Sequence, residues 1–393
     1  MSRSRKGPTP APAGMSRSTP PTSGRCASKT AVTEPRLIAD PEQVDAGWMT
    51  DVLRHSGAVP ADAAVVGLDA EQIGTGQVGC NVRYLLAYEP AGAGPPSVVA
   101  KFASRDESSR AAGVQTLTYE TEVAFYRDIA PTVDVSRPRC HFAAVEAGTP
   151  NVVLVLEDLA PAESGDQLSG CGVEQARLAV VEAARLHGPR WGDPALLDVP
   201  WLADKQAGDP ALIAAFAMFW PGFCDRYRPA LSAQSLEVGD RMAASGAGWA
   251  EEDPPALSVC HADFRLDNML FGPPGHPRPL SVVDWQTVRL GVGTSDVSYF
   301  MSAAMPPDER RSCEAQLVGA YHSALARYGV EGYSLDRCWE DYRRYSFNGF
   351  FMGVFASMVV QRTERGDAMF MAMVNGAAAQ VCDLDALEFL GRG

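Results

Sequence analysis

Residues 258–271 read Ser258-Val-Cys-His261-Ala-Asp263-Phe-Arg265-Leu-Asp-Asn268-Met-Leu-Phe271, and a second segment, Ser281-Val-Val-Asp284-Trp285, follows shortly after. Together the two segments supply the polar groups that phosphoryl transfer needs. Asp263 can accept the proton of a hydroxyl group, while Asn268 and Asp284 can hold Mg²⁺ against the phosphates of a nucleotide.

The local pattern predicts a strand–turn–strand unit. Residues 268–271 (Asn-Met-Leu-Phe) form a short, mostly apolar run, residues 272–279 (Gly-Pro-Pro-Gly-His-Pro-Arg-Pro) break regular structure, and residues 280–283 are rich in β-branched side chains. A hairpin of this kind brings Asn268 and Asp284 close together. A surface hairpin whose His261 and Asp263 only cap turns is the plain alternative. The complete set favours the catalytic loop of kinases, which has the spacing His-x-Asp-x4-Asn.

A glycine-rich segment lies toward the N-terminus, where Gly74, Gly76 and Gly79 fit the pattern G-x-G-x-x-G. Dinucleotide-binding folds share this pattern, but they need a helix that opens at the third glycine. Here residues 82–88 (Val-Arg-Tyr-Leu-Leu-Ala-Tyr) predict a strand. We therefore expect the loop to fold over nucleotide phosphates, as in kinases. An ordinary glycine-rich hairpin turn is the alternative for this segment taken alone.

Lys101 lies near the end of an apolar strand that begins at Ser97. A lysine in an apolar strand is costly to bury unless it is paired, and kinases use such a lysine to bind the α- and β-phosphates. Its partner is expected on the following helix, where Glu120 and Glu122 are the candidates. Glu122 flanks the apolar stripe of that helix more closely, so we expect it to bind Lys101.

An apolar run over residues 151–156 (Asn-Val-Val-Leu-Val-Leu) predicts a buried strand that ends in Glu157-Asp158-Leu159. In a two-lobed kinase this is the position of the hinge between the lobes. The backbone groups of Glu157 and Leu159 would then bind the adenine edge. No particular side chain is required there, so the prediction rests on the order of the elements alone.

Taken together, these motifs resemble the aminoglycoside phosphotransferase and choline-kinase-like superfamily of small-molecule kinases, and within it the ecdysteroid-kinase-like branch. The resemblance extends from about Pro41 to Leu390. It is carried by the glycine segment with Asn81 and Arg83, by Lys101, by Glu122 to Tyr126, by residues 156–159, by Ala184-Arg-Leu-His187, by residues 261–268, by Asp284-Trp-Gln286 and by residues 293–299. The glycine that usually follows the catalytic-loop histidine is Ala262 here.

The resemblance implies an α+β, two-lobed protein-kinase-like fold with a small antiparallel-sheet N-lobe and a larger, mainly helical C-lobe. We expect a basic tail rich in Pro and Ser over residues 1–35, which we predict to be disordered, the N-lobe over residues 36–158 and the C-lobe over residues 159–393. Helices are predicted from Asp40 through Val52, over residues 174–187 and 213–227, over residues 313–328, and from Cys338 onward.

The resemblance also implies ATP and Mg²⁺ as cofactors and assigns roles to residues. Asp263 would orient or deprotonate the acceptor hydroxyl, and Asn268 and Asp284 would bind Mg²⁺. Arg265 would neutralise charge on the transferred phosphoryl group or form a structural ion pair. His261 and Asp296 would support the loop without taking part in the chemistry.

The implied activity is transfer of the γ-phosphoryl group of ATP to a hydroxyl of a small molecule. A protein substrate fits less well, because Trp285 and Gln286 stand in place of Phe-Gly and no long activation loop follows. The acceptor would be an aminoglycoside, a choline-like compound or a sterol- or macrolide-like alcohol. A catalytically inactive nucleotide- or ligand-binding protein of this fold is the alternative, although Lys101 and the three other key residues are present.

Two features bear on the choice of acceptor. Residues 347–358 and 369–373 are rich in Phe and Met, which suits either a pocket for a bulky apolar alcohol or ordinary helix packing. The carboxylates Asp336, Glu340 and Asp341 suit either an amino sugar or a solvated helix face.

The net charge of −14, with positive charge clustered disproportionately in the first 36 residues, argues against nucleic acid or a membrane as a partner. The nine cysteines are scattered without a C-x-x-C motif and predict reduced thiols in a cytoplasmic protein, with no zinc site. The N-terminal segment lacks the apolar core of a signal peptide. The longest apolar stretch, Phe350–Val360, is too short to span a bilayer, which needs about 20 residues.

Overall fold

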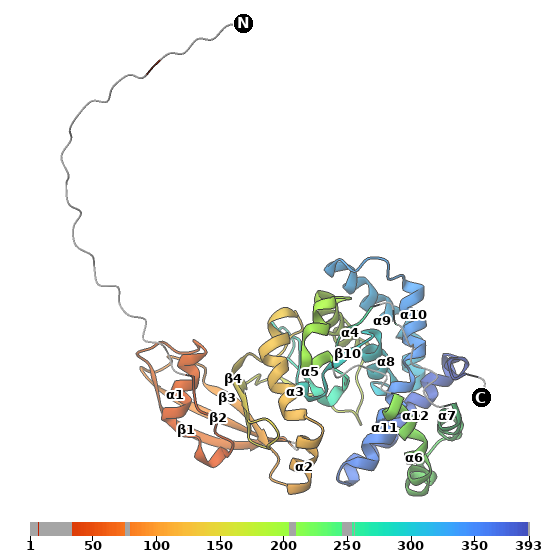
Figure 1. Ribbon diagram of the computed structural model, residues 1–393, viewed down its shortest axis with the longest axis horizontal. Coiled ribbons are helices and arrows are strands. Elements are labelled where there is room, and N and C mark those ends of the chain that lie inside the picture. Colours follow the sequence, from red (N-terminus) through yellow and green to blue (C-terminus); the bar gives the residue numbers. More distant parts are fainter. Residues whose placement is uncertain are drawn as a thin grey trace, which may run out of the picture. The chain divides into compact units, whose positions relative to one another are not determined.

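The computed structural model describes residues 7, 34–74, 79–203, 210–245, 254 and 256–391, with the side chains of residues 210–214 left aside. Gly76 and nearly all of the predicted tail lie outside the described residues. The described chain combines a sheet of antiparallel strands with a larger set of helices (Figure 1).

The N-lobe is built on a five-stranded antiparallel sheet in the order β1-β2-β3-β5-β4. Its strands are β1 (Ala64–Ile73), β2 (Gly79–Glu89), β3 (Ser97–Ala103), β4 (Cys140–Val145) and β5 (Val152–Glu157). β1 and β2 pair from Ala64 with Glu89 to Ile73 with Asn81, so the glycine segment joins their ends. A strand therefore follows this segment, where a dinucleotide-binding fold would need a helix.

Different helices cover the two faces of this sheet (Figure 1). They are α1 (Ala46–His55) on one face and, on the other, α3 (Thr118–Ala124), which follows α2 (Glu107–Gln115). Because side chains alternate along a strand, β3 buries Val98, Ala100 and Phe102 against α1 and directs Lys101 to the face of α3. β5 is buried on both faces, which explains its unbroken apolar sequence.

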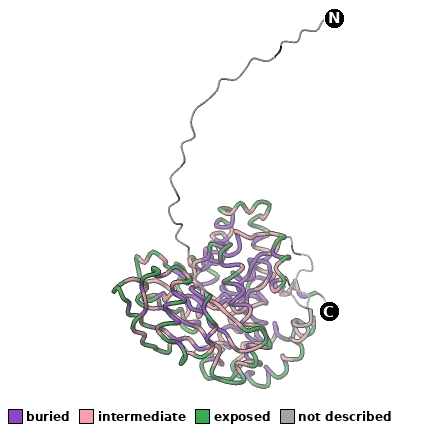
Figure 2. Tube along the Cα trace, turned by 60° about the vertical axis from the view of Figure 1, so that its left-hand side comes forward, coloured by how far each residue is buried: buried purple, intermediate pink, exposed green. Residues whose placement is uncertain are grey.

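The C-lobe is mainly helical. Its helices are α4 (Val173–His187), α5 (Pro200–Ala203), α6 (Pro210–Tyr227), α7 (Ala233–Ser245), α8 (Thr294–Ala303), α9 (Pro307–Leu325), α10 (Leu335–Arg344), α11 (Phe347–Val359) and α12 (Glu364–Asp383). Buried positions are concentrated inside this part (Figure 2). Within the described residues, no helix combines the length and the apolar character needed to cross a membrane.

Two small sheets hold the segment that opened the sequence analysis. One consists of β6 (Glu163–Ser164), β8 (Met269–Phe271) and β9 (Leu280–Val282), and the other pairs β7 (Ser258–Cys260) with β10 (Arg289–Gly291). β8 and β9 form the predicted hairpin, in register from Met269 with Val282 to Phe271 with Leu280.

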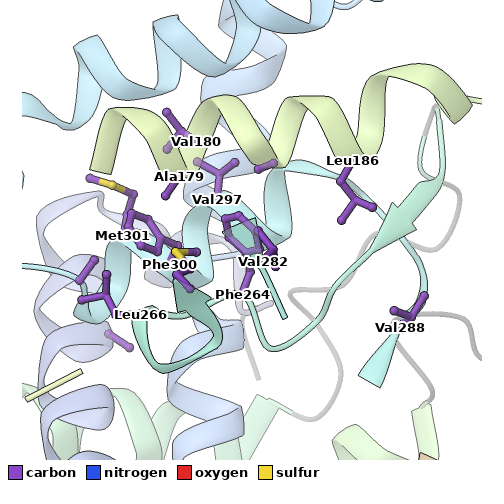
Figure 3. Packing of buried hydrophobic residues seen from close by; sticks show 14 of the residues in the cluster. Ala179, Val180, Leu186, Phe264, Leu266, Val282, Val288, Val297, Phe300 and Met301 are labelled. Atoms are coloured by element: carbon purple, nitrogen blue, oxygen red, sulfur yellow. The ribbon is translucent and has the colours of Figure 1, made fainter. Parts of the chain in front are cut away.

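The catalytic-loop segment is anchored in the core on both sides of Arg265. Phe264 and Leu266 are fully buried, and Figure 3 shows them among side chains of α4 and α8. The ring of Phe264 meets that of Phe300 edge to face, with 6.1 Å between the centroids. Burial of these two apolar side chains fixes the backbone of Arg265 between them.

The predicted α+β fold, with an antiparallel-sheet N-lobe and a helical C-lobe, is confirmed. The exact lobe boundaries remain a prediction. The helix predicted from Asp40 through Val52 is wrong in one respect, because it consists of two elements. Asp40 caps a single 3-10 turn (Pro41–Gln43), and α1 then starts at Ala46 with Asp45 as its own cap, whose carboxylate accepts from the Trp48 N–H at 2.7 Å.

Candidate active site

Lys101 lies between two carboxylates from different lobes. Its Nζ is 2.7 Å from Oε2 of Glu122 in α3 and 2.6 Å from Oδ1 of Asp284, which follows β9. Glu120 is directed elsewhere, since its Oε1 accepts a hydrogen bond from the N–H of Gly148 at 3.0 Å. The structure thus brings together three of the residues proposed from the sequence.

Burial and the neighbouring charges shift the pKa values of these three residues in different directions. Burial opposes the charged form of Lys101, but the negative charges of Asp284 and Glu122 outweigh it and raise the pKa of the lysine. Burial also raises the pKa of Glu122, and the lysine does not fully offset it. Burial acts in the same direction on Asp284, but there the positive charge of Lys101 prevails and the pKa of Asp284 is lowered. Lys101 therefore favours the ionised form of Asp284 more strongly than that of Glu122.

The two described glycines of the loop, Gly74 and Gly79, are required for different structural reasons. A Cβ at Gly79 would lie 3.1 Å from Cε of Lys101 and 3.3 Å from the carbonyl oxygen of Phe102, so a larger residue would displace the lysine. Gly74 has a φ of +72°, a left-handed conformation that glycine adopts without steric cost. A cavity of about 260 Å³ borders both glycines and extends to Arg105.

Asp263 accepts hydrogen bonds from three side chains. The hydroxyl of Tyr299 donates to Oδ1 at 2.8 Å, and Nε of Arg265 lies 2.9 Å from Oδ1 and 3.1 Å from Oδ2. Nδ2 of Asn268 donates to Oδ2 at 2.8 Å and also to the backbone carbonyl of Asp263 at 2.8 Å. The carboxylate is consequently held in one orientation.

The loop around Asp263 is held by Asp296 and His261. The carboxylate of Asp296, in the first turn of α8, accepts from the N–H groups of His261 at 2.7 Å and Ala262 at 3.0 Å. Nδ1 of His261 accepts from the Asp263 N–H at 3.2 Å, so Nε2 carries the proton and donates to the carbonyl of Val283 at 3.0 Å. Both ring nitrogens are therefore engaged in holding the loop against β9.

Asp296 is fully buried and is also bound by a second histidine. Nε2 of His187, the last residue of α4, lies 3.2 Å from Oδ2 of Asp296. Burial opposes ionisation of Asp296, but the hydrogen bond and charge of His187 prevail, so its pKa is lowered. Cys260 lies close to these two side chains, but both oxygens of Asp296 are already committed to the loop and to His187.

Two residues of the site have strained backbones. Ala262 has a φ of +65° and Asp284 a φ of +68°. This left-handed conformation costs a residue with a side chain roughly 1–2 kcal/mol. Such strain persists only where the surroundings hold it, and here the hydrogen bonds to Asp296 and the pairing with Lys101 do so.

Trp285 fixes the position of Asp284 relative to α3. Its ring is fully buried and stacks on that of Phe125, with centroids 4.0 Å apart and planes 7° from parallel. Phe125 directly follows α3, the helix that carries Glu122. The stacked rings therefore hold the segment that carries Asp284 against the helix that carries Glu122.

The residues proposed as the hinge lie at the end of β5, whose last residue is Glu157. The backbone N–H of Glu157 is used within the sheet, where it donates to the carbonyl of Arg139 at 2.8 Å, and its side chain pairs with Arg278. The carbonyl of Leu159 accepts from the Ala162 N–H at 2.9 Å. The N–H of Leu159 donates to no group in the described part of the chain, so it is available to a ligand.

Three residues at the site were not proposed from the sequence. Besides Tyr299, they are Gln286, whose Nε2 donates to Oδ2 of Asp284 at 3.3 Å, and Asp267, whose Oδ2 lies 2.5 Å from an Nη of Arg265. A signal for Tyr299 exists, because it follows Asp296 by three residues and therefore shares its helix face.

The remaining acceptor atoms suit a hard cation. Asn268 directs its amide nitrogen to Asp263, and no group among the described residues donates to its Oδ1, which can therefore act as a ligand. The N–H of Val283 donates to the carbonyl of Asn268 at 3.0 Å, so the strand that leads to Asp284 runs beside Asn268. Oxygen ligands of this kind, one amide and one carboxylate, are those that Mg²⁺ takes beside substrate phosphates.

Residues 209–329 match the sequence model of the ecdysteroid kinase-like family. This match confirms the resemblance found in the sequence, and it spans the catalytic loop, Asp284 and α8. No curated protein sequence matches the chain at a significant level.

Among solved structures, the chain is similar to a putative aminoglycoside phosphotransferase from Ralstonia eutropha, with 16% identity, a TM-score of 0.49, and coverage of 85% of this chain and 98% of that one. It is also similar to an ethanolamine kinase from Plasmodium vivax, with 10% identity, a TM-score of 0.48, and coverage of 86% and 87%. A gentamicin-bound aminoglycoside phosphotransferase gives 14% identity, a TM-score of 0.47, and coverage of 81% and 94%.

Proposed function

We propose that the chain is an ATP- and Mg²⁺-dependent kinase that transfers the γ-phosphoryl group to a hydroxyl of a small molecule. One observation carries the proposal. Lys101 in the N-lobe contacts Asp284 in the C-lobe at 2.6 Å, and the hairpin that ends at Asp284 begins at Asn268, which binds Asp263. A phosphate-binding lysine, two metal ligands and a proton acceptor are thus joined by two direct contacts and one hairpin.

Each residue then has a definite role. Lys101 binds the α- and β-phosphates, and Glu122 holds the lysine in place. Asn268 and Asp284 bind Mg²⁺, which supplies positive charge to the phosphate oxygens when it is bound. The Leu159 N–H and the Glu157 carbonyl bind the adenine edge.

The transfer itself is a direct displacement. The acceptor oxygen forms a bond to the γ-phosphorus while the bond from that phosphorus to the bridging oxygen of ADP breaks. Asp263 accepts a hydrogen bond from the acceptor hydroxyl and aims its oxygen at the γ-phosphorus. The hydroxyl proton passes to the Asp263 carboxylate, which releases it to solvent after transfer.

The surroundings of Asp263 support an apolar acceptor. Tyr299, Phe370 and Met373 are buried together, with Met352, Val360 and Met369 among the partly buried residues packed against them. Tyr299 binds Asp263 directly. This cluster, which we call the methionine cluster, therefore lies where the body of an acceptor would rest, and methionine adapts well to bulky apolar ligands.

The carboxylates considered for an amino sugar are largely engaged. Asp341 is buried and binds Arg337 at 2.9 Å and the hydroxyl of Tyr333 at 2.7 Å. Glu340 pairs with Arg344 at 3.5 Å. Neighbouring arginines thus offset charges that a polycationic acceptor would need. We accordingly place a bulky apolar alcohol ahead of an aminoglycoside or a choline-like compound.

A panel of hydroxyl compounds incubated with Mg²⁺ and ATP tests the proposal. It contains sterol- and macrolide-like alcohols, aminoglycosides, and choline with ethanolamine, and mass spectrometry detects the gain of one phosphoryl group. Asp263→Asn should abolish the product and retain nucleotide binding, while Asp51→Asn, an exposed change on α1, should leave product formation intact.

The outcomes separate the two candidate functions. A phosphorylated compound that forms with wild type and not with Asp263→Asn supports the kinase and identifies the acceptor class. Mg²⁺-dependent ATP binding without ADP release, from any acceptor or from water, would support the catalytically inactive binding protein instead. Absence of both binding and turnover contradicts the proposed function.

A further inference from the structure

The carboxylate of Asp263 has no free position for an acceptor hydroxyl. A carboxylate offers about four lone-pair sites in its plane. Oδ1 is contacted by Tyr299 and Arg265, and Oδ2 by Asn268 and Arg265, at distances between 2.8 and 3.1 Å. If Asp263 acts on an acceptor hydroxyl, as the proposed function requires, one of these three donors has to leave first.

Two of the donors are fixed. The hydroxyl of Tyr299 sits at the end of a side chain on α8 that is only 6% exposed. Asn268 is 5% exposed, and its Nδ2 makes a second hydrogen bond to the backbone of the loop at 2.8 Å. Movement of either side chain would leave buried polar groups without partners, which is unfavourable.

Arg265 is different, because it has another partner. One of its Nη atoms lies 2.5 Å from Oδ2 of Asp267 and 3.3 Å from Sδ of Met369 in the methionine cluster. Asp267 is itself held in place, since its Oδ1 accepts from the Gln167 N–H at 2.9 Å and lies 3.6 Å from Arg365. Arg265 can therefore release Asp263 and remain bound to Asp267.

We infer that Arg265 occupies the position of the acceptor hydroxyl on Asp263 in the resting enzyme, and that Asp267 retains the guanidinium when the acceptor displaces it. The inference rests on the proposed function. Arg265 and Asp267 act in it as positioning residues. The pair withholds Asp263 until a hydroxyl compound arrives and keeps a positive charge beside the transfer site afterwards.

A double-variant cycle tests the inference with water as the acceptor. The balanced reaction is ATP plus water giving ADP, phosphate and a proton, and release of ADP is measured against Mg²⁺-ATP concentration. The proteins compared are wild type, Asp267→Asn, Arg265→Gln and the double variant. Asn retains the oxygen that Gln167 requires and removes the charge that holds Arg265.

Without the negative charge of Asp267, Arg265 should remain bound to Asp263. We expect Asp267→Asn to lower kcat about tenfold with little change in KM for Mg²⁺-ATP. Adding Arg265→Gln should restore most of the loss, because no guanidinium is left to occupy Asp263. Asp267→Glu, which keeps the charge, should be less impaired than Asp267→Asn. A purely structural pair predicts the opposite, namely a double variant no faster than Asp267→Asn.

Each outcome decides. Recovery of activity in the double variant supports the inference. Lack of recovery, or full activity of Asp267→Asn, overturns the inference. The proposed function still stands in that case, provided that the wild type releases ADP. No ADP release by wild type, with water or with any compound of the panel, overturns both. Melting temperatures establish that the variants fold, and Asp267→Ser replaces Asp267→Asn in the cycle if the latter does not.

Discussion

Gly79 shows how closely one residue of the loop is fitted to the site. Its α-carbon hydrogen faces the stem of Lys101, where a Cβ would lie 3.1 Å from Cε. Gly79→Ala should therefore shift the lysine and raise KM for Mg²⁺-ATP about tenfold. Steady-state kinetics measures the change. Gly319→Ala is the matched control, because a Cβ there meets open space, and an unaltered KM in Gly79→Ala would contradict the proposed role of the lysine.

His141 gives a pH dependence at the residue scale. Burial, aided by the charge of Arg139, lowers the pKa of His141 from 6.5 to about 4. Its Nδ1 contacts the hydroxyl of Ser56 at 3.2 Å, and within the described residues its buried Nε2 has no partner. The folded state thus resists protonation more than the unfolded state. The stability involved is complete above pH 6.5 and is lost as the pH falls toward 4.

Replacing this histidine should flatten the pH profile of stability. In His141→Gln, the fall in the free energy of unfolding between pH 6.5 and 4 should be smaller than in wild type by up to about 3 kcal/mol. Urea denaturation at several pH values measures it. His55→Gln, an exposed change on α1, should keep the wild-type slope. Equal slopes for His141→Gln and wild type would contradict the prediction.

Which side chains meet could be predicted from the sequence only where a motif names them. Two sequence signals identified residues that lie together in the structure. They are the spacing from Asp263 to Asn268 and the apolar strand before Asp284. Asp267 lies inside the same motif, but its pairing with Arg265 depends on side-chain orientation, which spacing does not determine. Contacts such as that of Arg265 with Met369 join residues far apart in the chain and leave no local pattern.

At the scale of elements, α8 serves the loop through one face. Asp296 binds the loop backbone, and Tyr299, one turn later, binds the side chain of Asp263. Asp296→Asn should leave one buried donor unpaired, because an amide has a single acceptor oxygen. We expect a loss of about 1–3 kcal/mol in the free energy of unfolding.

Chemical denaturation measures this loss. Asp308→Asn, in the exposed first turn of α9, should cost much less. If the two variants were equally stable, the carboxylate of Asp296 would not be what holds the loop.

Elements were predictable where one signal dominates. The β8–β9 hairpin follows from two apolar runs on either side of Gly and Pro, and β5 from the five consecutive apolar residues 152–156. α7 and β4 have weaker patterns, and they become regular only by packing in the fold. The division between the 3-10 turn at Pro41 and α1 shows another limit, because both Asp40 and Asp45 can cap a helix and periodicity alone does not choose between them.

At the scale of the whole molecule, the proposed ligand should stabilise the folded chain. Mg²⁺-ATP would contact Lys101 in one lobe and Asn268 with Asp284 in the other, so it binds only the folded protein. At a concentration of about 100 times Kd the gain is about 2.7 kcal/mol. Thermal melting should show a rise that needs both Mg²⁺ and ATP and that disappears in Asp284→Asn. NAD should give no rise, and a larger rise with NAD would favour a dinucleotide site.

The group of Lys101, Glu122 and Asp284 carries one positive and two negative charges. Under the proposed function, Mg²⁺-ATP would exchange the counter-ions of this group: a phosphate would take the place of Asp284 on the lysine, and a cation would take the place of the lysine on Asp284. ATP alone would leave the aspartate bare, and Mg²⁺ alone would have to compete with an ammonium already in contact. By linkage, each would raise the affinity for the other by the same factor. Such a site would admit the two together and discriminate against either one by itself.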